Sequence, residues 1–178
     1  MYKHLLNSIE KEIKICKRLY TKISPDKMHF RPKEGVRSIL ELLQYLSFIG
    51  SSMLIYWLEN DDTDFTSFFV EKTNVANVMV HDGFLSAMDE QLVTIKNLFN
   101  QINEEDLYKE VTYPWGGKVQ LGEGIISTSI KWLVAYKLQL FLLIKLSGDN
   151  QLKAADAWVL TDLPDIINHS IWFTHGKC

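Results

Sequence analysis

The feature that most constrains the fold is the helical spacing of apolar residues along four long segments. From Tyr2 to Ile23, apolar residues recur at steps of three and four, with lysine and glutamate on the opposite face. This pattern predicts a first helix that ends before Pro25, because proline has no N–H to donate and its ring clashes with the preceding turn. The other three segments with a helical pattern span residues 39–60, 84–102 and 124–147.

Two of these helices carry specific signals at their ends. Ser38 and Glu41 have the spacing of a capping box, in which the serine hydroxyl and the glutamate carboxylate each accept a backbone N–H of the other residue. They predict the start of the second helix. Gly148 directly follows the last helix and predicts its end, because glycine readily adopts the left-handed conformation of a helix C-terminus.

The connections between the helices differ in character. Residues 65–78 (FTSFFVEKTNVANV) are expected to form an irregular crossover with a short helical turn. The segment before the last helix shows strand-like alternation around Val111 and Val119, with a turn at YPWGG between them.

The pattern as a whole predicts an all-α, single-domain protein of 178 residues, 47% of them hydrophobic, which suffices for a real core. Residues 1–148 are expected to form a four-helix bundle with one long crossover connection. Residues 149–178 are expected to form a C-terminal tail with a short extra helix near LKAADAW.

Charge and composition exclude several classes of partner. The net charge is −3 and the lysines are scattered, so nucleic acid is not an expected partner. The longest apolar runs, such as WLVAY and LFLLI, are too short to cross a bilayer, and the N-terminal residues do not have the pattern of a signal peptide.

Cys16 lies on the apolar stripe of the first helix, where a buried, inert thiol is expected, and Cys178 ends the chain. Two cysteines are too few for a disulfide framework, which fits a cytoplasmic protein with no membrane association.

The second and fourth helical segments are apolar around most of their circumference. This is more apolar surface than the inside of one small bundle requires. Either the crossover and the tail cover it, or a second copy of the chain does. We expect a homodimer.

Two stretches resemble a known family. FRPKEGVRSILELLQYLSFI, residues 30–49, resembles the part of the DinB/YfiT-like superfamily in which a loop with proline and glycine leads through a serine cap into a Leu-Leu-x-His-Leu pattern. The YPWGG loop and the helix ending near KLQL resemble the His-x-x-x-His-Arg-x-Gln segment of the same family. The resemblance covers most of residues 1–148 and implies a DinB-like four-helix bundle. Members of this family typically hold nickel, zinc or iron with three histidines, and characterised relatives are transferases and isomerases that use thiols such as bacillithiol or mycothiol.

The resemblance places other residues where the metal ligands stand in the family. The histidine position of the second helix falls on Tyr45, and the two positions of the fourth helix fall on Trp132 and Tyr136. Lys137 stands in place of the family's arginine, and Gln139 matches its glutamine. An indole nitrogen has no lone pair for a metal, and a phenol must first lose a proton with an unperturbed pKa of about 10. We therefore predict no metal site and no cofactor.

The histidines of the chain do not rebuild such a site. None of the five has a partner at the helical spacing of a metal pair, and the loose group of His169, His175 and Cys178 is more simply a solvated tail.

Two interpretations of Tyr45, Trp132 and Tyr136 remain. The three rings could fill the space of the lost metal, since aromatic side chains at helical spacing usually belong to a core. Alternatively, they could line a small pocket in which the phenol hydroxyls orient a polar ligand. Further residues that could border such a pocket are Glu41, Gln139, Tyr113 and Trp115.

The sequence therefore predicts a DinB-like protein that has lost the three-histidine metal site and acts as a non-catalytic ligand-binding or structural relative. One alternative is a thiol-dependent transferase that uses the same pocket with a tyrosine acid or an unrecognised metal site. A third is a pure interaction protein that uses its apolar surfaces.

Overall fold

The computed structural model describes residues 1–59, 63–148 and 152–160. Within these residues the chain is all-α, as predicted, except for one hairpin of two short strands. The principal elements are α1 (Tyr2–Tyr20), α2 (Ile39–Leu58), α3 (Phe65–Asn77), α4 (Phe84–Asn100), β1 (Glu110–Thr112), β2 (Lys118–Gln120), α5 (Leu121–Ile125), the π-helical turn η4 (Ile126–Ile130) and α6 (Lys131–Leu146). Short 3-10 turns are η1 (Pro25–Lys27), η2 (His81–Gly83), η3 (Asp106–Tyr108) and η5 (Ala154–Ala157).

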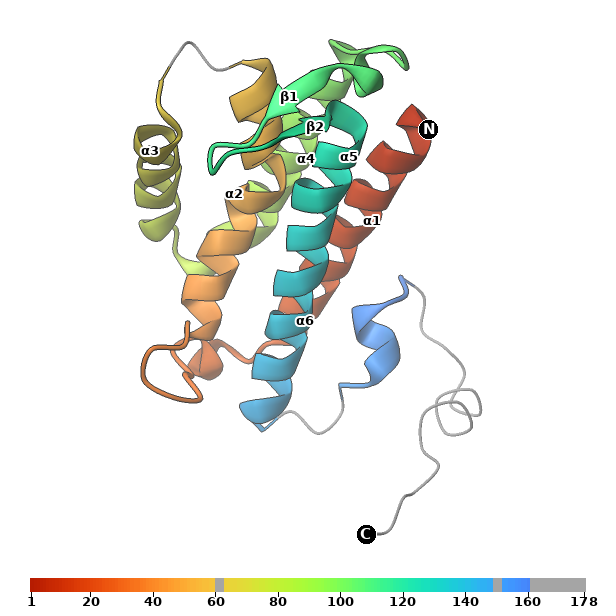
Figure 1. The fold of residues 1–178 in the computed structure, drawn as a ribbon. Helices are drawn as coiled ribbons and strands as arrows, with labels where there is room; N and C mark the ends of the chain where they lie inside the picture. Colours follow the sequence, from red (N-terminus) through yellow and green to blue (C-terminus); the bar gives the residue numbers. More distant parts are fainter. Residues whose placement is uncertain (60–62, 149–151, 161–178) are drawn as a thin grey trace, which may run out of the picture.

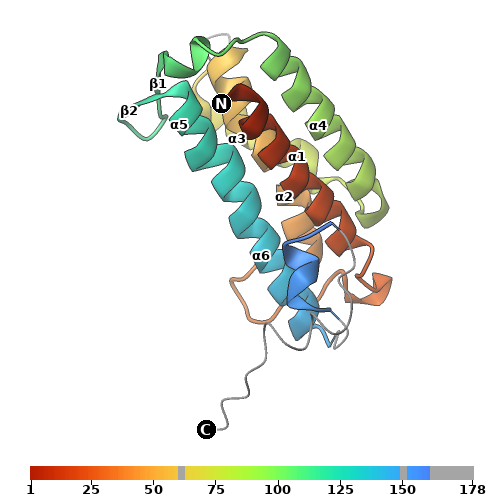
Figure 2. The same ribbon diagram turned by 90° about the vertical axis from the view of Figure 1, so that its right-hand side faces the viewer.

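Long helices lie side by side along the length of the molecule (Figures 1 and 2). α5, η4 and α6 continue one another, so they act as one long helix. α2 packs against both α4 and α6, and α1 packs against the same two helices from the other side. Read from N- to C-terminus, α1 and α6 point in the same direction in space, and α2 and α4 point in the opposite direction. α3 lies outside this group, against α2.

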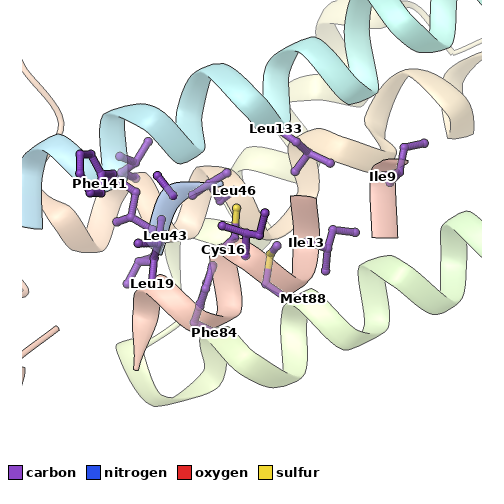
Figure 3. Close-up of a cluster of buried hydrophobic side chains, with 14 of the residues drawn as sticks. Ile9, Ile13, Cys16, Leu19, Leu43, Leu46, Phe84, Met88, Leu133 and Phe141 are labelled. Atoms are coloured by element: carbon purple, nitrogen blue, oxygen red, sulfur yellow. The ribbon is translucent and has the colours of Figure 1, made fainter. Parts of the chain in front are cut away.

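The core lies where α1, α2, α4 and α6 face one another (Figure 3). The labelled members of this cluster are Ile9, Ile13, Cys16, Leu19, Leu43, Leu46, Phe84, Met88, Leu133 and Phe141. The expectation of a buried, inert thiol is confirmed for Cys16, which has no exposed surface. Burial raises the pKa of its thiol to about 12, so the reactive thiolate is scarce near neutral pH.

The start of α2 confirms the predicted capping box. The Ser38 hydroxyl accepts the backbone N–H of Glu41 at 3.3 Å, and the Glu41 carboxylate accepts the N–H of Ser38 at 2.7 Å. By length and composition, α2 is the one helix among residues 1–59, 63–148 and 152–160 that could cross a membrane. However, 61% of the apolar stretch of this helix is buried against the rest of the protein, and a helix in the core of a protein has the same composition.

The prediction that residues 65–78 are irregular with a short helical turn is wrong, because this connection forms the 13-residue helix α3. Asp64 caps its N-terminus by accepting the backbone N–H of Ser67 at 3.1 Å. Threonine, valine and asparagine give the segment a poor intrinsic helix propensity. Packing of Phe68 and its aromatic neighbours against α2 overrides that propensity, as tertiary contacts often do.

The predicted strand alternation is confirmed. Val111 and Val119 face each other in the antiparallel β1–β2 pair. Gly116 and Gly117 have φ angles of 97° and 90°, a conformation that only glycine adopts without strain, which explains the turn at YPWGG. The following helix starts at Leu121, three residues before the predicted start.

The short helix expected near LKAADAW is confirmed as η5. η5 packs against α1 and α6, and Asp156 pairs with Arg18 at 3.1 Å and with Lys22 at 3.6 Å. The expectations for residues 161–178 lie outside the described residues.

α2 packs closely against its neighbours at Gly50, and this generates a prediction. A Cβ there would lie 2.7 Å from Oε1 of Gln91 and 2.9 Å from Cδ1 of Leu133. Gln91 has little room to move, because its amide bonds the α2 backbone at Leu46 and Ser51. We expect Gly50→Ala to lower the free energy of unfolding by about 1 kcal/mol or more, because overpacking costs about 1–3 kcal/mol and exceeds the gain in helix propensity.

Urea denaturation measures this loss. Asn97→Ala, at an exposed position of α4, is the control and should stay within about 0.5 kcal/mol of the wild type. A Gly50→Ala protein as stable as the wild type would contradict the close packing.

Candidate functional site

Tyr45 and Tyr136 meet between α2 and α6. Their ring centroids are 4.7 Å apart and the ring planes are inclined by 70°, an edge-to-face contact. Both side chains are half-buried. Phe48, one turn further along α2, packs against Tyr45 with its centroid 5.3 Å away. The structure thus brings together two of the three residues that the resemblance aligns with metal-ligand positions.

The third of these residues, Trp132, contacts a different group. Its ring centroid lies 6.1 Å from that of Trp115 in the β1–β2 turn. Trp115 stacks in turn on Tyr113, with centroids 4.9 Å apart. Trp132 therefore belongs to an aromatic cluster at the hairpin end of α6, and not to the contact between the two tyrosines.

The donor set does not fit a divalent metal. Burial raises the pKa of the Tyr45 phenol above its usual value, and the neighbouring Tyr136 raises it further, although the nearby Arg37 opposes both effects. A phenolate at Tyr45 is therefore harder to form than in water. Since Trp132 offers no lone pair, the three side chains leave a metal without adequate ligands.

A pocket of about 390 Å³ opens beside Tyr45, between α2, α3 and the loop that precedes α2. Its walls are Arg31, Gly35, Val36, Arg37, Glu41, Tyr45, Phe48, Phe69, Thr73 and Asn77. The α3 wall is held in place by Gln44, whose buried amide donates to the backbone carbonyls of Asn77 at 3.0 Å and Met79 at 2.9 Å. These bonds tie the end of α3 to α2, so the two walls have a fixed spacing.

The charges around the pocket are unequally paired. Arg31 donates to both carboxylate oxygens of Glu41, at 2.7 and 2.8 Å. The pKa of Glu41 lies below its usual range, first because the N–H of Ser38 bonds its carboxylate and then because of Arg31. Arg37 has no carboxylate within ion-pair distance among the described residues, and its guanidinium lies over the Tyr45 ring, 4.2 Å from the centroid.

The other residues expected near a pocket lie in different places. Glu41 lines this pocket, although its carboxylate is already engaged. Gln139 is exposed on α6 and is not part of the pocket wall. Trp115 borders another hollow, of about 440 Å³, with Tyr56, Asp64, Phe65, Thr66 and Pro114. Tyr113 packs on Trp57 with centroids 5.8 Å apart.

Sequence reasoning missed several residues of the pocket. Phe69, Thr73 and Asn77 were hidden because their segment was not recognised as a helix, yet their spacing of four places them on one face. Asp64 as a cap and the cluster of phenylalanines after it could have revealed that helix. Arg37 lies in a loop, and no pattern in the sequence distinguishes it from the other basic residues there.

Lys137, which the resemblance aligns with an arginine, lies in the interior and not in the pocket. Its side chain is 1% exposed, and its Nζ donates to Glu12 of α1 at 2.6 Å. Nζ also lies 4.6 Å from the centroid of the Trp158 ring, so the segment after α6 covers this ion pair. Leu133, Lys137 and Leu140 are all buried in the structure. Their helical spacing could have indicated from the sequence that Lys137 lies on an inward face of α6.

The remaining features of the described residues offer no alternative centre. A hollow of about 470 Å³ lies beside the N-terminal residues, where the Met1 ammonium pairs with Glu104 at 2.7 Å. Within the part of the chain that the structure describes, no three His, Cys, Asp or Glu side chains gather closely enough to hold a metal ion. His169, His175 and Cys178 lie outside the described residues.

Comparison with known proteins adds no relative. No model of a known protein family matches the chain, and no curated protein matches it either. The relationship to the DinB/YfiT-like superfamily therefore remains a prediction from the sequence.

The pair of Lys137 and Glu12 generates a prediction about stability. We expect Glu12→Ala to lower the free energy of unfolding by about 3 kcal/mol, because it leaves the Lys137 charge buried without a partner. The double variant Glu12→Leu/Lys137→Met should lose much less, since it removes both charges and keeps apolar volume. Chemical denaturation of the three proteins measures the difference.

Glu10→Ala serves as the control on the same helix. Glu10 pairs with Lys14 and Lys96, whose side chains are 51% and 44% exposed, so its loss should cost about 1 kcal/mol or less. If Glu12→Ala costs no more than this control, the ion pair between Lys137 and Glu12 does not carry a buried charge.

Proposed function

We propose that the protein is a DinB-like four-helix bundle without a metal site, which binds a small molecule in the pocket beside Tyr45 and does not catalyse a reaction. The observation that carries this proposal is the contact between Tyr45 and Tyr136 at the border of a pocket of about 390 Å³.

The arrangement of the helices supports the bundle. α1, α2, α4 and the long helix that ends with α6 pack pairwise, with α4 and α6 each lying between α1 and α2. α2 and α4 run parallel, so the chain must cross the length of the molecule between them. α3 lies in this connection, which supports a bundle with one long crossover.

The aromatic contact supports the loss of the metal. In a three-histidine site, the side chains surround an ion and leave an open position for a substrate. Here the rings of Tyr45 and Tyr136 contact each other between α2 and α6. The proposal combines the two interpretations of these aromatics. The two tyrosines pack against each other, as residues that fill a space would, and Tyr45 also lines the pocket.

The chemistry of the pocket favours binding over catalysis. Its ionisable groups are Arg31, Arg37, Glu41 and Tyr45. Arg31 and Glu41 neutralise each other, and an arginine stays protonated near neutral pH, so it does not act as a base. The raised pKa of Tyr45 makes it a weak proton donor in the transferase alternative, in which a tyrosine would act as the acid. A pocket of about 390 Å³ suits a small ligand.

We also propose that the protein forms a homodimer through α6. Leu138, Leu142 and Leu146 are spaced by four residues, so they form one stripe on this helix. They are 37%, 47% and 62% exposed, unusual for leucines that share one face. The second apolar helix, α2, has less need of a partner copy because α3 packs against it.

The ligand-binding proposal is tested by blocking the pocket. In a thermal-shift screen of small aromatic and thiol compounds, we expect some to stabilise the wild type, by about 2.7 kcal/mol at one hundred times the dissociation constant. Thr73→Trp should abolish this stabilisation, because Thr73 lines the pocket and an indole would occupy it. Asn74→Trp, at the neighbouring exposed position of α3, should leave it intact.

Two results would contradict the proposal. One is stabilisation that persists in Thr73→Trp, which would place the ligand elsewhere. The other is stoichiometric nickel, zinc or iron in the purified, tag-free protein that disappears in the double variant Tyr45→Phe/Tyr136→Phe. Such a metal would show that the phenols do act as ligands.

The dimer is tested by placing a charge on the α6 stripe. We expect light scattering at micromolar concentration to give a dimeric mass for the wild type and a monomeric mass for Leu142→Glu, because a buried carboxylate without a partner is strongly unfavourable. Val93→Glu, at a position of α4 that is 57% exposed, should remain dimeric. A monomeric wild type would refute the dimer.

A further inference from the structure

We infer that the ligand of the pocket is a small organic monoanion, whose carboxylate is held by Arg37 and whose flat apolar part lies against Phe48 and Phe69. This inference rests on the proposed ligand-binding function and names the chemical class of the ligand.

The first support is the charge balance of the pocket. Arg31 is matched by Glu41, whose two carboxylate oxygens both accept from Nη2 of Arg31, and Glu41 is further engaged by the backbone of Ser38. Tyr45 carries no charge near neutral pH. Arg37 therefore supplies the net charge of the pocket wall, a single positive charge. One guanidinium matches one carboxylate, which favours a monoanion over a phosphate group with two charges.

The second support is the way in which Arg37 is held. Its guanidinium carbon lies 4.2 Å from the centroid of the Tyr45 ring and 5.8 Å from that of Tyr136. Contact with a ring face uses the positive charge and the flat surface of the guanidinium, but it does not use up the five N–H donors. The side chain of Arg37 makes no hydrogen bond to the described residues. The two tyrosines thus position a planar fork of donors whose hydrogen-bonding capacity is still available.

The third support is the apolar wall beside this charge. The Phe48 and Phe69 rings meet with centroids 5.5 Å apart, and Phe69 also lies 6.2 Å from Tyr45. All three rings line the pocket. A ligand with a flat apolar body could place it against these rings while its carboxylate reaches Arg37. At the α3 side, the amide of Asn77 makes no side-chain hydrogen bond within the described residues and offers a second polar contact.

The test uses three probes that share one ring system and differ in charge: 1-naphthaleneacetate, 2-(1-naphthyl)ethanol and 2-(1-naphthyl)ethylamine. Isothermal titration calorimetry with the full chain should give a dissociation constant for the carboxylate at least about tenfold lower than for the alcohol, with the amine weakest. Arg37→Met should remove this preference and bind the carboxylate and the alcohol about equally. Lys33→Met, an exposed lysine of the same loop outside the pocket, makes the same change in net charge and should keep the preference.

The fold is expected to survive Arg37→Met, because the side chain is exposed, and equal melting temperatures without ligand confirm this. If the three probes bind equally and Arg37→Met changes nothing, the inference of an anionic ligand is overturned while ligand binding in the pocket stands. If Arg37→Met and Lys33→Met weaken the carboxylate alike, its attraction is non-specific and the inference is overturned. If no probe binds at millimolar concentration, the inference is overturned, and the pocket-blocking screen then decides separately whether the proposed function also fails.

Discussion

The candidate site depends on the contact between Tyr45 and Tyr136, which joins α2 and α6. Each aromatic ring removes a large area from water, and an edge-to-face pair is favourable beyond that burial. The two rings bridge α2 and α6, so they occupy the place where the resemblance would put a metal. They also give Arg37 a surface to rest on, because its guanidinium lies over both of them. Tyr45 of this pair lines the pocket beside Arg37, Phe48 and Phe69.

The walls of the pocket are fixed by buried polar side chains that bond the backbone. Gln91 of α4 holds α2 by bonding Leu46 and Ser51, and Gln44 of α2 holds the end of α3. A buried amide left without partners would be unfavourable, so each glutamine favours one relative position of its two helices. α2 is therefore held on its α4 side by Gln91 and on its α3 side by Gln44. A pocket between helices held in this way changes its shape little, which lowers the entropic cost of binding.

Much of the fold could be predicted from the sequence, because apolar spacing and capping are local signals. The capping box at Ser38 and the hairpin valines were recognised for that reason. α3 was not, since its residues have low helix propensity and its helix is stabilised by contacts with α2, which a single sequence does not display. The candidate site shows the same division. Tyr45 and Tyr136 were found through a short motif, whereas Phe69 and Arg37 join the site only when α3 and the loop before α2 fold against Tyr45.

A divalent metal ion and an arginine side chain can each present a positive charge to a ligand. This connects the proposed loss of the metal with the position of Arg37. A divalent ion in a bundle of this kind would offer a positive charge to the substrate between α2 and α6. The two tyrosines contact each other in that space, and the pocket beside Tyr45 opens on the α3 side of α2. On that side, a positive charge is again present, as the guanidinium held 4.2 Å from the Tyr45 ring. A guanidinium can orient an anion through paired hydrogen bonds, but it cannot activate a water or a thiol as a metal does. If the chain belongs to the family that it resembles, phenols in place of imidazoles would favour recognition of a ligand over chemistry on it.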